Sequence, residues 1–97
     1  MNIIVAYDIA ATDSSSGRKR LRKVAQLCLN YGQRVQYSVF ECRVNAIQMH
    51  QLQTALSKVI VPDEDNVRIY QLSGAHEDCV WTQGVNRYVD FDGPLIY

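Results

Sequence analysis

The sequence predicts one α+β domain in which two helices cover one face of an antiparallel β-sheet. Short segments rich in β-branched residues alternate along the chain with two longer segments whose apolar residues recur at helical spacing. Their order is β-α-β-β-α-β, which is the order of the ferredoxin-like fold. A length of 97 residues with 47% hydrophobic residues is enough for one modest core, so we predict a single domain over residues 1–97.

The first strand, predicted over residues 3–9, is apolar except for one carboxylate, Asp8, near its end. Side chains of a strand alternate between its two faces, so Tyr7 and Asp8 point to opposite sides of the sheet. The predicted faces are Ile3, Val5, Tyr7 and Ile9 on one side, and Ile4, Ala6, Asp8 and Ala10 on the other.

The first helix is predicted from Arg18 to about Asn30, after a Ser-rich loop that offers a capping hydroxyl. Its apolar stripe consists of Leu21, Val24, Ala25 and Cys28, and its basic side chains lie opposite. The period-two pattern of residues 35–40 predicts a second strand. We expect a reversal near Glu41 and Cys42 and a short third strand after it, although one long strand is the alternative.

The second helix is predicted to begin with a capping box, because Asn45 is followed three residues later by Gln48. Its apolar face continues to Ile60, residues 62–66 form a turn, and residues 67–72 alternate as another strand. A sheet with both helices on one side leaves its other face open, and the apolar side chains on that face predict a partner that covers it.

We expect the partner to be a second copy of the chain, and we place the tail, residues 73–97, at the dimer interface. The tail is rich in turn residues, but Arg87–Phe91 and Pro94–Tyr97 are too apolar for a disordered end. We therefore predict that the tail adds a strand there.

The formal net charge is zero, but the charge is unevenly distributed. Residues 1–43 hold seven basic and three acidic residues, whereas residues 44–97 hold three basic and seven acidic ones. The three cysteines are far apart and odd in number, which favours neither a disulfide framework nor a zinc site. No signal peptide or membrane-spanning run is found, so we expect a soluble cytoplasmic protein that does not bind a membrane.

Five basic residues gather at the start of the first helix, where they oppose the helix macrodipole. Local helix stability does not explain this placement. A phosphate backbone does, because helix N-terminal amides and basic side chains both bind anions, and a solvated helix face is the alternative. The predicted nucleic-acid-binding residues are Arg18, Lys19, Arg20, Arg22 and Lys23.

Asp8 allows two interpretations, a metal ligand beside the substrate or a carboxylate that caps the next turn. A dimer formed through the open sheet face would bring Asp8 of the two subunits together. Mg²⁺ accepts one or two carboxylates together with waters and phosphate oxygens, so this pair would be sufficient. Such a site would hydrolyse a phosphodiester without a dedicated protein base.

Other kinds of site have little support in the sequence. His50 and His76 have no companions at zinc-ligand spacing, and no glycine-rich phosphate motif or catalytic serine motif is present. We expect four aromatic residues to lie in the core or an interface rather than to stack on bases, namely Tyr7, Tyr37, Phe40 and Tyr70.

Four stretches together resemble the CRISPR-associated Cas-two family. They are Tyr7–Ile9, Arg20–Val24, Tyr31–Glu41 and Val67–Leu72. The end of the chain, Asp92–Tyr97, resembles the subtype I-C members of that family.

The resemblance implies a ferredoxin-like homodimer that works with the Cas-one integrase in CRISPR adaptation, the capture of new spacers. Members of the family have been described as metal-dependent endonucleases acting on single-stranded RNA or double-stranded DNA. The resemblance places Mg²⁺ or Mn²⁺ at Asp8, and it links the positions of Arg34 and Phe40 to activity.

Two functions are therefore predicted. In the first, the chain is a metal-dependent endonuclease in which the pair of Asp8 residues holds the metal, while Arg34 and Ser38 position the phosphate. In the second, it is a non-catalytic dimeric scaffold that binds duplex DNA and bridges integrase subunits. Arg34 is equally plausible as an ion-pair partner, and both RNA and DNA stay open as substrates.

Overall fold

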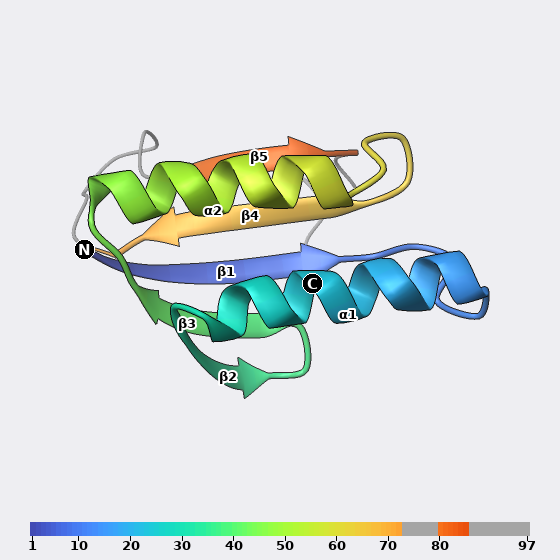
Figure 1. Ribbon diagram of the computed structural model, residues 1–97, viewed down its shortest axis with the longest axis horizontal. Helices are drawn as coiled ribbons and strands as arrows, with labels where there is room; N and C mark the ends of the chain where they lie inside the picture. Colours follow the sequence, from blue (N-terminus) through green and yellow to red (C-terminus); the bar gives the residue numbers. More distant parts are fainter. Residues whose placement is uncertain (73–79, 86–97) are drawn as a thin grey trace, which may run out of the picture.

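The computed structural model describes residues 1–72 and 80–85, and its elements follow the predicted order with one strand added. The elements are β1 (Asn2–Asp8), α1 (Ser15–Leu29), β2 (Gly32–Gln36), β3 (Val39–Arg43), α2 (Ala46–Val59), β4 (Asn66–Gln71) and β5 (Val80–Gly84). The strands form one antiparallel sheet in the order β2-β3-β1-β4-β5, and both helices lie on the same side of it (Figure 1). The ferredoxin-like α+β prediction is confirmed.

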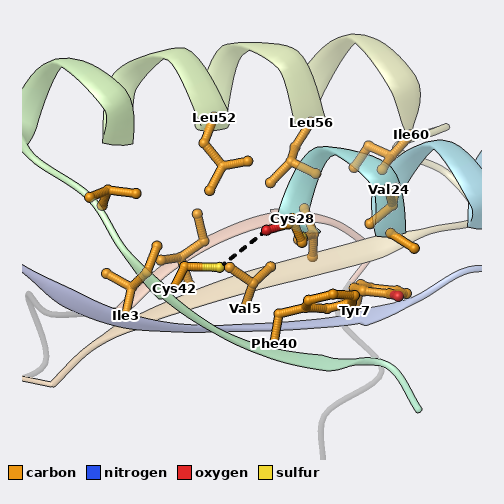
Figure 2. Close-up of a cluster of buried hydrophobic side chains, with 14 of the residues drawn as sticks. Ile3, Val5, Tyr7, Val24, Cys28, Phe40, Cys42, Leu52, Leu56 and Ile60 are labelled. Atoms are coloured by element: carbon orange, nitrogen blue, oxygen red, sulfur yellow. Dashed lines mark hydrogen bonds between the residues drawn. The ribbon is translucent and has the colours of Figure 1, made fainter. Parts of the chain in front are cut away.

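The hydrophobic core lies between the helices and the sheet (Figure 2). The two predicted faces of β1 are confirmed, and the structure shows which one packs against the helices, since Ile3 and Val5 are fully buried and Tyr7 is 6% exposed. Leu52 and Leu56 of α2 are also fully buried above them. Each aliphatic side chain buried in this way contributes about 1.5–3 kcal/mol, so the contact of this sheet face with the helices is a main source of stability.

Both helices begin with a side-chain cap. The hydroxyl of Ser14 accepts a hydrogen bond from the amide of Gly17, so α1 starts three residues before the predicted Arg18. A Cβ atom at Gly17 would lie 2.0 Å from the carbonyl oxygen of Ala11, so only glycine lets the first turn pack so closely on the loop before it.

The capping box of α2 is confirmed. The side chain of Asn45 accepts from the amide of Gln48 at 2.8 Å, and the side chain of Gln48 accepts from the amide of Asn45 at 3.0 Å. These two bonds satisfy amides that the helix itself leaves unpaired.

The reversal between the second and third strands was predicted near Glu41 and Cys42, and this prediction was wrong. The turn lies at Tyr37 and Ser38, and β3 runs beside β1 from Val39 onward. The pairing of β2 with β3 shifts between Arg34 and Gln36, so the strand holds one extra residue there. The bulge interrupts the two-residue repeat of β2. Because the turn follows directly, residues 35–40 belong to two strands rather than to one alternating strand.

The added strand, β5, pairs with β4 of the same chain at one edge of the sheet. Trp81 of β5 is partly buried and packs against the core. The segments Arg87–Phe91 and Pro94–Tyr97, on which the predicted interface strand rested, lie outside the described residues, as does the subtype I-C ending. Among the helices in the described ranges, none is long and apolar enough to cross a membrane.

Candidate functional site

Asp8 is the last residue of β1, and its side chain is exposed. It lies across from Asn66 of β4, on the sheet face opposite the helices, where Ile4 and Ala6 precede it along β1. Asn66 is only 8% exposed, and its side-chain amide donates a hydrogen bond to the Thr82 hydroxyl at 3.3 Å. The sequence placed Asn66 in a turn, so this polar neighbour of Asp8 was missed.

One subunit offers little to a metal ion. Within residues 1–72 and 80–85, no group of three or more His, Cys, Asp and Glu side chains is placed to hold one. A single exposed carboxylate with water is a weak site, whereas two carboxylates with phosphate oxygens suit Mg²⁺ or Mn²⁺. Within the described residues, one subunit would bring the Asp8 carboxylate to such an ion and two copies would bring two, and Mg²⁺ accepts one or two carboxylates together with phosphate oxygens.

Arg34 and Phe40 lie on the opposite face of the sheet from Asp8. They are register partners on β2 and β3, and Phe40 in turn pairs with Val5 of the buried face. Phe40 is fully buried, with its ring centroid 6.1 Å from that of Tyr7. A fully buried ring does not contact a substrate, so the predicted catalytic role of Phe40 is corrected to a structural one.

The buried ring of Phe40 packs against the side chain of Arg34 and fixes its position. The guanidinium carbon of Arg34 lies 5.2 Å from the Phe40 ring centroid, within the range of a cation–π interaction. Burial raises the pKa of the Tyr7 phenol, with a further contribution from Cys28, and the Arg34 guanidinium beside the phenol acts in the opposite direction. Tyr7 is thus a neutral polar group, and together with Phe40 it orients an exposed cation.

Asp8 and Arg34 lie on opposite faces of the sheet, but both lie near the same end of it, as does Ser38. The backbone carbonyl of Ser38 accepts a hydrogen bond from the amide of Tyr7 at 3.1 Å, which places the β2–β3 turn beside the end of β1 that carries Asp8. The loop from β1 to α1 leaves from the same end (Figure 1). A nucleic-acid backbone that contacted both Arg34 and Asp8 of one subunit would have to pass around the end of the sheet where the β2–β3 turn lies.

The basic cluster at the start of α1 divides into two kinds of residue. Arg18, Lys19, Arg22 and Lys23 are exposed. Arg20 differs, because its side chain is 12% exposed and its Nε lies 2.8 Å from Oδ2 of Asp65. Arg20 also donates to the Ser16 hydroxyl and to the Ala10 carbonyl, so it is removed from the predicted nucleic-acid-binding set.

Asp65 forms hydrogen bonds with three separate segments at the end of the sheet that carries Asp8. It is fully buried and accepts hydrogen bonds from the amides of Ala10 and Val61, both at 2.9 Å, in addition to Arg20. Burial raises the pKa of this carboxyl, but the bonds from Val61, Arg20 and Ala10 outweigh burial and hold the pKa below its ordinary value. Asp65 therefore connects the loop after β1, helix α1 and the loop before β4.

Comparison with known proteins agrees with this architecture. Residues 1–78 match the family model described as CRISPR associated protein Cas2. The "CRISPR-associated endoribonuclease Cas2 1" of Moorella thermoacetica is 47% identical over 96 residues, which cover 99% of each chain. The "CRISPR-associated endonuclease Cas2" of Halalkalibacterium halodurans is 43% identical over 97 residues, the full length of both chains.

The solved structures give the same result. The crystal structure of Streptococcus pyogenes Cas2 at pH 6.5 superposes with a TM-score of 0.70 at 44% sequence identity, covering 75% of this chain and 87% of that one. The sheet order, the two helices on one face and the sequence match over nearly the whole length all point the same way. This chain belongs to the CRISPR-associated Cas2 family.

Proposed function

We propose that this chain is a metal-dependent endonuclease that hydrolyses phosphodiester bonds of nucleic acid as a homodimer. The exposed carboxylate of Asp8 at the end of the open sheet face carries this proposal. The names of the relatives, endoribonuclease and endonuclease, support the reaction class. We further propose that the protein acts in the cytoplasm during CRISPR adaptation, together with the Cas-one integrase.

The open sheet face is the proposed dimer surface. The register of β1 with β3 and β4 puts Ile4, Ala6, Val39 and Tyr70 on the same face as Asp8, together with the charged residues Glu41 and Arg68. These four side chains are partly buried rather than covered by a helix. The apolar side chains of this mixed face favour a covering partner, and a second copy that covers it would join two Asp8 residues into one site.

Each group then has a distinct task. Bound Mg²⁺ or Mn²⁺ supplies Lewis-acid polarisation of the phosphodiester and lowers the pKa of a bound water. The two Asp8 carboxylates would hold the ion, while Arg34 and Ser38 would position a phosphate of the substrate. The exposed cations of α1 would hold the remaining phosphates, which is a sequence-independent form of binding.

Removal of divalent cations is expected to abolish cleavage by the wild-type protein. Because one carboxylate per subunit cannot replace the charge of the ion, labelled RNA and DNA should stay intact in EDTA. Cleavage should return when Mg²⁺ or Mn²⁺ is added in excess, as measured on denaturing gels. Equal cleavage with and without the chelator would contradict the proposal.

A non-catalytic scaffold is the second candidate function, and four exposed cations on one helix favour it. Replacing Arg22 and Lys23 together by Ala is expected to weaken duplex binding at low salt, because the cations neutralise phosphates and release counterions. The slope of log affinity against log salt should fall by about one for each phosphate that is no longer neutralised. Binding is measured by fluorescence anisotropy at several salt concentrations.

The matched control for this double variant exchanges the two residues, Arg22→Lys together with Lys23→Arg, which keeps both cations on α1. It should leave both the affinity and the salt slope close to those of the wild type. A double variant with unchanged duplex affinity would remove the main support for the scaffold.

A further inference from the structure

A hollow of ≈ 290 Å³ lies on the helix side of the sheet, between α1 and the β2–β3 turn. Its lining includes three arginines, Arg18 and Arg22 from α1 and Arg34 from β2. Tyr7 and Leu21 contribute its apolar surface, and Tyr37 stands beside them in the turn. Arg34 and Ser38, proposed above to position a phosphate, also line this hollow, while Asp8 lies on the other face of the same sheet end.

The charge of the hollow calls for an anion. The described residues that line it include three arginines and no acidic residue, while most of the lining surface is apolar. Arg18 donates from Nη1 to the backbone carbonyl of Asp13 at 2.9 Å, which fixes its direction, and Phe40 fixes Arg34. Arginines that are held in place are suited to a phosphate, which several N–H groups can bind together.

Tyr37 adds an exposed aromatic ring to this hollow. It is 88% exposed, so of the two places expected for it, the core and an interface, the core is excluded, and packing within this subunit does not account for an aromatic residue in the turn. An exposed aromatic side chain next to bound phosphate is the arrangement on which unpaired bases stack. Ligand pockets begin at about 300 Å³, so the hollow has the size for one nucleotide and is far too small for a duplex.

We propose that this hollow binds one unpaired nucleotide of a single-stranded segment, with its phosphate on Arg18, Arg22 and Arg34 and its base stacked on Tyr37. The inference rests on the proposed function only in taking nucleic acid as the ligand. It assigns Arg34 to substrate binding on the helix side of the sheet end, while Asp8 serves the open face. Bases inside a duplex are stacked on each other and present no face to Tyr37, so the site selects single strands.

The test is the binding of a short labelled single strand and of a duplex of the same length, both in EDTA so that cleavage plays no part. Tyr37→Ala is expected to weaken single-strand binding roughly tenfold, which corresponds to the loss of one stacked base. Duplex affinity should stay unchanged, and Tyr37→Phe should restore single-strand binding because the ring is kept. Since Tyr37 is exposed, thermal unfolding of the variants should match that of the wild type.

The control variant is Ile47→Ala, which removes another exposed hydrophobic side chain, on α2. It should change neither affinity. Competition by a free nucleoside monophosphate distinguishes a site for a lone nucleotide from one that needs a strand. Displacement of the labelled single strand only by the unlabelled oligonucleotide supports the proposal. Equal displacement by the oligonucleotide and the monophosphate overturns the need for a strand. Unchanged single-strand affinity in Tyr37→Ala, or equal losses for single strand and duplex, would overturn the stacking site.

A fluorescence experiment gives an independent readout. Tyr37→Trp should show emission that is quenched when the unlabelled single strand is added, because a stacked base quenches an indole ring in contact with it. Lack of quenching at saturating strand would contradict the stack. Asp8→Asn should retain both the quenching and the single-strand affinity, so a failure of the nuclease proposal would leave this result intact.

Discussion

Asp8→Asn is expected to reduce divalent-dependent cleavage by at least about a hundredfold while leaving the dimer and its nucleic-acid affinity intact. Loss of a residue that merely orients a metal ligand costs about 10- to 100-fold in activity or metal affinity, and loss of the ligand itself should cost more. Asn keeps the shape of the side chain and removes its charge. The measurements are initial cleavage rates with Mg²⁺ or Mn²⁺, and dimer mass by light scattering.

The pairing of the two carboxylates has its own consequence. If the ion is held across the dimer axis, a heterodimer with one wild-type and one Asp8→Asn subunit should be strongly impaired rather than half active. Co-expression with two different affinity tags isolates that heterodimer. Half of the wild-type rate would mean that each subunit works alone, and the site would then not be a pair.

Asp13→Asn is the matched control, since Asp13 is an exposed carboxylate in the loop that follows β1. It should cleave at the wild-type rate. Full activity of Asp8→Asn, in protein freed from host nucleases, would contradict the nuclease proposal. Spacer acquisition in cells that carry the same variant separates the two candidate functions, because a scaffold does not need the carboxylate.

Arg20→Ala is expected to destabilise the fold by about 3 kcal/mol, the lower end for breaking a buried ion pair by removing one partner. The variant leaves the Asp65 carboxylate fully buried without its cation. Two backbone amides still donate to Asp65, which keeps the loss from being larger. Urea unfolding followed by circular dichroism measures the change.

Arg22→Ala is the control for this prediction, because Arg22 is exposed on the same helix two residues further on. Its effect should stay within about 0.5 kcal/mol, as for most surface substitutions. If the two variants had equal stability, Arg20 would have no structural role and would return to the nucleic-acid-binding set.

The same ion pair gives a pH dependence of known sign. The pKa of Asp65 is lower in the folded protein than its ordinary value, so the folded state binds fewer protons there than the unfolded state. The stabilisation is complete above the ordinary carboxyl pKa and is lost as the pH falls through the lower, folded value. In Arg20→Ala this pH-dependent loss should be smaller, because without the cation the folded pKa of Asp65 lies closer to its unfolded value, which the substitution does not change.

Local patterns in the sequence determined much of the fold. The alternation in β1 predicted its two faces because successive side chains of a strand point to opposite sides, and the structure placed Ile3 and Val5 under the helices. The capping box of α2 was predicted because both of its partners lie within three residues of each other. The resemblance rested on motifs of the same local kind, and the family match over residues 1–78 confirmed it.

The candidate site depended on contacts that no local pattern contains. In the sequence, Arg20 cannot be told apart from the four cations around it. The fold brings its side chain to Asp65, which is 45 residues away in the chain. The bulge in β2 moved the turn to Tyr37 and left this residue exposed, which a two-residue repeat cannot reveal.

The sequence alone determined which residues carry charge and where β1, β4 and the two helices lie, since these follow from side-chain chemistry and periodicity. Only the tertiary structure decided that Asp8 and Arg34 lie on opposite faces of the sheet and that Phe40 is buried beneath Arg34. The physical reason is that a face is assigned by strand pairing, and pairing is set by the packing of the whole core rather than by any one segment.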